Sequence, residues 1–147
     1  MLLNTFVVRF HVIFSSSFLL IALGITIWSL YGWLKKKEYT KGSHIFGLIF
    51  LGFLYADLLM GVVLYFFLRK PDEILTAAQA IKYSSLRFWA VQHFSFMVFV
   101  VVLSQIGKIF ISRTSESDRK FKYAFFYYGA ATLITIISVA IFLLRKQ

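Results

Sequence analysis

Four long runs of apolar residues make up most of the chain. They cover residues 10–34, 44–68, 87–112 and 121–144, and each is about 24–26 residues long. A bilayer core about 30 Å thick is crossed by about 20 helical residues, and lipid offers no partner to an open backbone. No run alternates as a strand does. The pattern predicts an all-α, membrane-spanning antiparallel four-helix bundle, with residues 1–147 forming a single transmembrane domain.

The longest connection between the runs covers residues 69–85. Pro71, Asp72 and Glu73 suit the first turn of a helix, and apolar residues follow at helical spacing. These features predict a short amphipathic helix over about residues 72–84, lying on the membrane surface. An ordinary structured loop is the alternative.

Composition agrees with a membrane protein. Of the 147 residues, 60% are hydrophobic, whereas soluble domains are about 45–50% apolar. A soluble bundle of very apolar helices is the alternative. The first run is too long for a cleaved signal peptide, and its lysines follow it, so we expect it to be retained. The chain has no cysteine, which excludes disulfides, thiolate metal sites and cysteine nucleophiles.

Basic residues indicate an orientation. The connections after the first and third runs lie on one side and hold nine Lys and Arg in dense clusters, against seven on the other side. Cytoplasmic loops are enriched in such residues, so we expect these two connections in the cytoplasm and both termini outside. The net charge of +10 is explained by anionic lipid headgroups without nucleic acid.

Small and polar residues mark the faces on which the helices would pack. His11, Ser15, Ala22 and Ser29 share one stripe of the first run, and His93 heads a similar stripe in the third. Small residues let membrane helices approach closely, so these stripes predict that both histidines face inward.

Several polar residues lie at one depth. Counted at about 1.5 Å per residue from the basic side, five of them lie about 20–30 Å away, and His11 lies at about 36 Å. The five are His93, Asp57, Tyr55, Ser138 and Ser15. An ionisable residue inside a span is costly and is a functional candidate by default.

Each candidate also has a purely structural interpretation. His93 would be a neutral imidazole bonded to a serine or tyrosine, or a ligand to haem or metal, or a contact for a proton or a quinone. Asp57 would be a carboxyl that is protonated or bonded to a tyrosine or serine. His11 lies near the interface, where a histidine costs little, and His44 lies in a loop junction where water solvates it.

Three segments carry a resemblance to a known family. They are KKKEYTKG after the first run, MGVVLYFF closing the second and LRFWAVQHF opening the third. In this order they resemble a family of small bacterial four-helix integral membrane proteins labelled cytochrome b. The resemblance covers about residues 11–111 and implies b-type haem, electron transfer and the bacterial inner membrane.

The family's histidines match His11 and His93, which the resemblance implies as haem iron ligands. A b-type haem needs an axial imidazole, which normally gives its other N–H to an acceptor. Asp57 and Tyr55 are the expected neighbours of His93 in this cofactor site.

Three positions differ from the family pattern. Tyr55 stands where the family has a histidine in its second helix, Gln92 replaces an acidic residue before His93, and Ser15 replaces an arginine.

No enzyme motif is present: the chain has no phosphate-binding glycine loop, no HExxH and no Ser/His/Asp order typical of hydrolases. Two hypotheses follow. One is an electron-carrying membrane cytochrome, with or without a neighbouring quinone site. The other is a haem-free accessory or scaffold subunit of a larger membrane complex.

Overall fold

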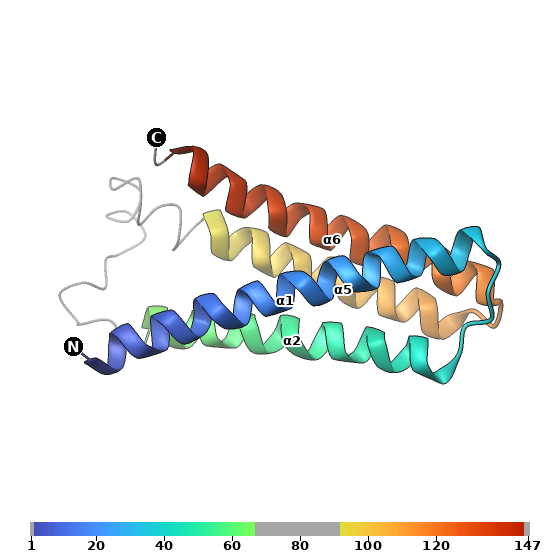
Figure 1. The fold of residues 1–147 in the computed structure, drawn as a ribbon, viewed down its shortest axis with the longest axis horizontal. Coiled ribbons are helices and arrows are strands. Elements are labelled where there is room, and N and C mark those ends of the chain that lie inside the picture. The colour runs from blue at the N-terminus through green and yellow to red at the C-terminus, as the bar shows by residue number, and fades with distance from the viewer. Residues whose placement is uncertain (1, 67–91, 146–147) are drawn as a thin grey trace.

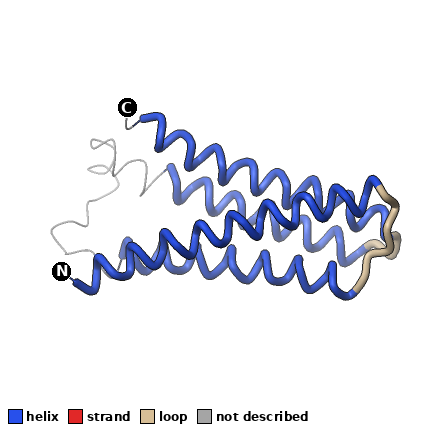
Figure 2. The backbone as a smooth tube through the Cα atoms, viewed as in Figure 1, coloured by secondary structure: helices blue, strands red, loops and turns tan. Residues whose placement is uncertain are grey.

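The computed structural model is a bundle of four helices that run alternately up and down (Figure 1). It describes residues 2–66 and 92–145. The helices are α1 (Leu2–Leu34), α2 (Lys41–Phe66), α5 (Phe94–Arg113) and α6 (Ser117–Arg145). The described residues contain no strand. Both chain ends lie at one end of the bundle, and the tan loops of Figure 2 lie at the other.

Each helix is long and apolar enough to cross a membrane. The candidate spans have mean hydropathies between 1.9 and 2.2 and are Thr5–Leu34, Lys41–Leu64, Phe94–Arg113 and Ser117–Ile141. Large apolar side chains also cover the outside of the bundle, such as Leu20, which is 71% exposed, and Ile27, which is 66% exposed. Such a surface suits lipid rather than water. The prediction of an all-α membrane-spanning four-helix bundle is therefore confirmed.

The helix ends differ from the predicted ones by a few residues. α1 begins eight residues earlier than expected, and α2 and α6 begin three and four residues earlier. These additional turns contain lysine, serine and arginine. Spans delimited by apolar residues leave such polar residues in the connections, although a helix also tolerates them. The predicted surface helix over residues 72–84 lies outside the described residues.

The loop after α1 is short because local hydrogen bonds reverse the chain. Lys36 is left-handed, with a φ of 49°. Its N–H donates to the Trp33 carbonyl, and the Lys37 N–H donates to the Gly32 carbonyl at 2.9 Å. This double closure is a Schellman motif. Thr40 then begins α2, because its hydroxyl accepts the Ser43 N–H at 3.4 Å as an N-cap.

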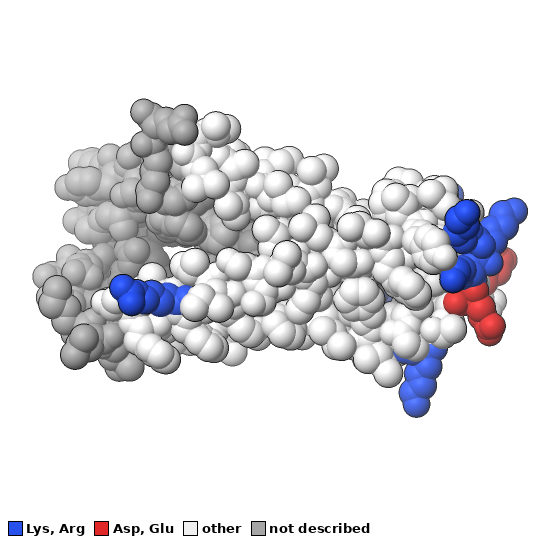
Figure 3. All heavy atoms as spheres, in the orientation of Figure 1, with Lys and Arg blue, Asp and Glu red and all other residues white. Residues whose placement is uncertain are grey.

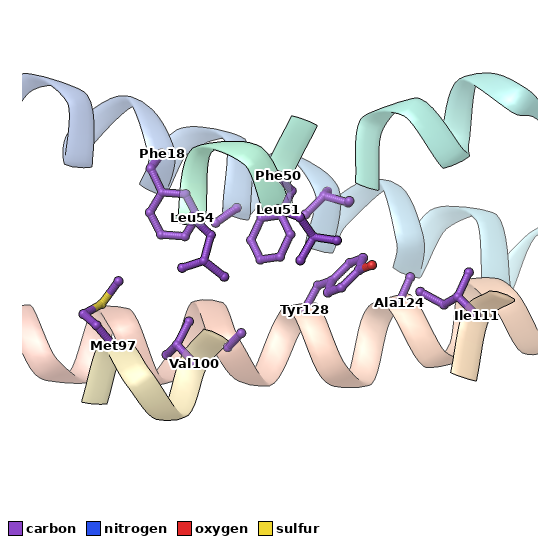
Figure 4. Close-up of a cluster of buried hydrophobic side chains, with 12 residues drawn as sticks. Phe18, Phe50, Leu51, Leu54, Met97, Val100, Ile111, Ala124 and Tyr128 are labelled. Atoms are coloured by element: carbon purple, nitrogen blue, oxygen red, sulfur yellow. The ribbon is translucent and has the colours of Figure 1, made fainter. Parts of the chain in front are cut away.

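The core is a layer of buried side chains contributed by all four helices. Phe18 and Phe50 stack with ring centroids 5.7 Å apart, and Phe50 also meets Tyr128 at 4.8 Å (Figure 4). Ala22 and Ala131 are both 0% exposed, so small side chains separate the backbones of α1 and α6. Close approach through small residues is the usual packing of membrane helices.

Polar side chains also join the helices. The Thr132 hydroxyl of α6 donates to the Tyr128 carbonyl of its own helix at 2.7 Å, and it lies 3.3 Å from the Ala22 carbonyl and 3.2 Å from the Thr26 hydroxyl of α1. The Trp28 indole donates to Ser43 of α2 at 3.2 Å. At the loop end the Tyr39 N–H donates to the Ser117 hydroxyl at 2.9 Å, which ties the two loops together.

Charged side chains collect at the loop end of the bundle, with little charge along the face shown (Figure 3). Both basic loops predicted from the sequence lie there, as alternating helices require. The end of the bundle that holds the two short loops is therefore its charged end.

We predict that Gly107→Ala destabilises the bundle. A Cβ on Gly107 of α5 would lie 2.4 Å from the Cβ of Tyr127, which is fixed to the backbone of α6, so the helices would have to separate. Overpacking of this kind costs about 1–3 kcal/mol. The measurement is thermal unfolding in detergent, followed by circular dichroism.

Gly52→Ala is the matched control, because a Cβ at Gly52 meets nothing within 4 Å. This variant should be neutral or more stable by up to about 1 kcal/mol, since alanine favours helix. Equal melting temperatures for the two variants would contradict close packing at Gly107.

Candidate functional site

Three polar side chains from α1 and α2 meet inside the bundle, toward the end that holds the chain termini. The Ser15 hydroxyl donates to Asp57 Oδ1 at 2.5 Å, and His11 Nδ1 lies 3.3 Å from the same oxygen. The Asp57 side chain is 7% exposed and that of His11 is 19% exposed. We call these three residues the His–Ser–Asp cluster.

The helical repeat explains why these residues meet. His11 and Ser15 are four residues apart and therefore lie on one face of α1. Leu54 lies four residues after Phe50, and Asp57 lies three residues after Leu54, so the three side chains share one face of α2. Phe50 and Leu54 are both fully buried, so the Asp57 carboxyl also faces the interior. The predicted inward stripe of α1 thus finds its partner on α2.

The two contacts to Asp57 differ in kind. The contact with Ser15 is a hydrogen bond, whereas His11 Nδ1 is buried without a hydrogen bond and lies 3.3 Å from the carboxyl oxygen. Intramembrane ionisable groups commonly pair with one another in this way, because an isolated charge is costly there.

A second polar contact joins α5 to α6. His93 Nδ1 lies 3.1 Å from the hydroxyl of Ser138, which is 0% exposed. His93 belongs to a single wide turn, residues 92–93, that leads into α5. This contact matches one of the predicted structural partners of His93, a serine.

The two histidines belong to one region of the bundle. His11 lies in the early turns of α1 and His93 leads into α5, and both helices begin toward the end of the bundle that holds the chain termini (Figure 1). The contacts given for Asp57 run to α1, and the contact with Ser138 runs to α6. A direct or water-bridged contact between Asp57 and His93 therefore stays a prediction.

Tyr55 does not join the His–Ser–Asp cluster. It is 40% exposed, and its hydroxyl donates to Gln105 of α5. Tyr55 and Asp57 are two residues apart, which places them on different sides of α2. The Tyr55 hydroxyl thus contacts α5 at Gln105, 12 residues along the helix from His93, and the assignment of Tyr55 as a neighbour of His93 stays a prediction.

Gln105 was not among the candidates taken from the sequence. An amide inside an apolar span was the available signal, because such side chains hydrogen-bond across membrane helices. The exposed His44 lies at the loop end of α2, away from the other two histidines, in agreement with its predicted solvation.

Among the described residues, no three or more His, Asp or Glu side chains are grouped so that they would hold a metal ion. A haem site needs fewer protein ligands than a metal-ion site, since one or two axial imidazoles are enough to bind the haem iron. His93 Nδ1 has a hydrogen-bond partner in Ser138, as ligating histidines usually do at their other ring nitrogen, whereas His11 Nδ1 lies near Asp57 without a hydrogen bond. His11 and His93 are the inward-facing imidazoles that the described residues offer to such a group.

Comparisons with protein-family models, with curated proteins and with solved structures found no match to this chain.

We predict energetic coupling between His11 and Asp57. Replacing both by alanine should cost less than the sum of the two single replacements, by about 1 kcal/mol, because each single variant leaves a buried polar partner behind. The coupling is measured by reversible unfolding of the four proteins in mixed micelles.

Ser29→Ala combined with Asp57→Ala provides the control. Ser29 is buried on the same helix, 14 residues from Ser15, or about 21 Å along the axis. These two changes should be additive. Additivity for His11 and Asp57 as well would show that the ion-pair contact contributes nothing.

Proposed function

We propose that this chain is a cytochrome-like membrane protein that binds a b-type haem in the half of the bundle that holds the chain termini. His93 is the principal ligand, and His11 is the second. The observation that carries the proposal is a pair of inward-facing imidazoles: Nδ1 of His11 faces Asp57, and Nδ1 of His93 faces Ser138.

Asp57 has a defined role in this proposal. Its carboxyl lies at Nδ1 of His11 and would hold that ring with Nε2 directed to the iron. The Ser15 hydroxyl, bonded to the same oxygen, keeps the carboxyl in place.

Ser138 has the corresponding role for His93. Its hydroxyl is fully buried on α6 and lies 3.1 Å from Nδ1. Ser138 would therefore fix the orientation of the ring across the α5–α6 interface. A bound haem would supply one-electron transfer, and the surrounding helices would exclude water from it.

A haem-free accessory subunit is the second candidate. The observation that favours it is the Tyr55–Gln105 pair, which places polar atoms on a partly exposed flank of α2 and α5 within the spans. Polar side chains in such a position hydrogen-bond between helices and would serve a partner in the membrane. Tyr55 also stands where the resembling family has a histidine.

We further propose that the protein lies in the bacterial inner membrane with both termini outside. The basic residues of the two short loops support this orientation, since cytoplasmic loops are rich in Lys and Arg. The bacterial location rests on the family resemblance.

We predict that the purified, haem-supplemented protein shows a Soret band and sharp bands on reduction. His93→Ala should abolish them, because it removes the principal ligand. His11→Ala should retain haem with an altered spin state, because only one axial imidazole remains. Absorption spectra in detergent provide the measurement.

His44→Ala is the matched control, since His44 is exposed at the other end of the bundle. Its spectrum should equal that of the unchanged protein. Absence of a Soret band in the supplemented protein would decide for the accessory-subunit candidate.

The orientation is tested with single cysteines, because the natural chain has none. In intact cells an impermeant thiol reagent should label Thr5→Cys and spare Glu38→Cys, and both should react after lysis. Labelling of position 38 with protection of position 5 would reverse the proposed orientation.

A further inference from the structure

A hollow of about 320 Å³ opens where α5 ends and α6 begins. It lies at the loop end of the bundle, between two candidate spans that stop at Arg113 and start at Ser117. The spans of a membrane helix end near the lipid headgroups, so this hollow opens at headgroup level. Its lining includes Arg113, Thr114, Ser115, Glu116 and Arg119.

The charges in this hollow leave a single positive excess. Arg119 Nε pairs with Glu116 Oε2 at 2.8 Å, which holds one guanidinium in place across one turn of helix. Arg113 is exposed and makes no ion pair within the part of the chain that the structure describes. Two arginines and one glutamate sum to +1, which matches the net charge of −1 on a lipid headgroup whose phosphodiester is its only charged group and which has no cation to face the arginines.

The chemical groups suit phosphate oxygens. Guanidinium groups bind phosphate through paired N–H donors, and the hydroxyls of Thr114 and Ser115 add further donors. The first turn of α6 also presents backbone N–H groups and the positive end of its dipole.

One wall of the hollow is apolar. Phe110 and Tyr123 line it, with ring centroids 5.4 Å apart. Phe110 is 42% exposed and lies on the side of the span. A free phosphate would leave these rings unused, whereas the glycerol and upper acyl carbons of a phospholipid would cover them.

We propose that this hollow binds the headgroup of one anionic phospholipid, with Arg113 and Arg119 on the phosphate and Phe110 and Tyr123 beside the glycerol backbone. The site is independent of the haem proposal, because it lies at the opposite end of the bundle from His11 and His93.

Native mass spectrometry of the full-length protein in detergent tests this proposal. With added phosphatidylglycerol we expect one lipid to be retained in preference to phosphatidylcholine. The double variant Arg113→Gln, Arg119→Gln should lower the apparent affinity about tenfold or more, because it removes two charge-assisted contacts. Its melting temperature without lipid should be unchanged, since both side chains are exposed.

The double variant Lys35→Gln, Lys41→Gln is the matched control, because it also removes two positive charges from the same end, outside the hollow. This control should leave the apparent affinity for phosphatidylglycerol unchanged. A loss of affinity as large as that of the arginine variant would overturn the proposal, because the lipid would then be held by the general positive charge of this end and not by a defined site. Equal retention of phosphatidylcholine would also overturn the proposal. Displacement of the lipid by millimolar inorganic phosphate would reassign the hollow to a free anion.

Discussion

Lipid provides no hydrogen-bond partner for a peptide group or a polar side chain, and this constraint governs the whole bundle. Regular helices satisfy the backbone along the spans. Some polar side chains are satisfied across helix contacts, as Ser15 is with Asp57 and Trp28 with Ser43, and others donate to carbonyls of their own helix, as Ser16 and Ser17 do. Large apolar side chains such as Leu20 and Ile27 face outward, toward lipid.

The same constraint shapes the candidate site. A carboxyl such as Asp57 is tolerated inside the bundle only with partners, and α1 supplies a hydroxyl and an imidazole on one face. Those partners are also the groups that a haem site requires around an axial histidine. A structural role and a cofactor role thus use the same atoms, so the spectroscopic measurement carries more weight than the geometry.

The two ends of the bundle have different chemistry. The loop end carries dense charge, short connections and hydrogen bonds between loops, and it contains the hollow with Arg113 and Arg119. The opposite half holds His11, Asp57, His93 and Ser138 in a low-dielectric interior. Contacts with charged headgroups at one end and chemistry with buried imidazoles at the other would therefore proceed without interfering.

Hydropathy over about 20 residues is a local property, so the sequence by itself determined the four spans and the two basic loops. Helical spacing is local too, and it correctly predicted that His11 and Ser15 face the interior together. The same spacing places Tyr55 and Asp57, which are two residues apart, on different sides of α2. The choice of neighbours was decided only by the tertiary structure: α1 packs on α2 and α6, and α5 packs on the same two. That order places Asp57 beside His11, His93 beside Ser138 and Tyr55 beside Gln105. It follows from how small residues such as Ala22 and Gly107 let neighbouring helices approach and how Gly32 leaves room for the Phe121 ring, which is a property of two surfaces in contact and not of either segment alone.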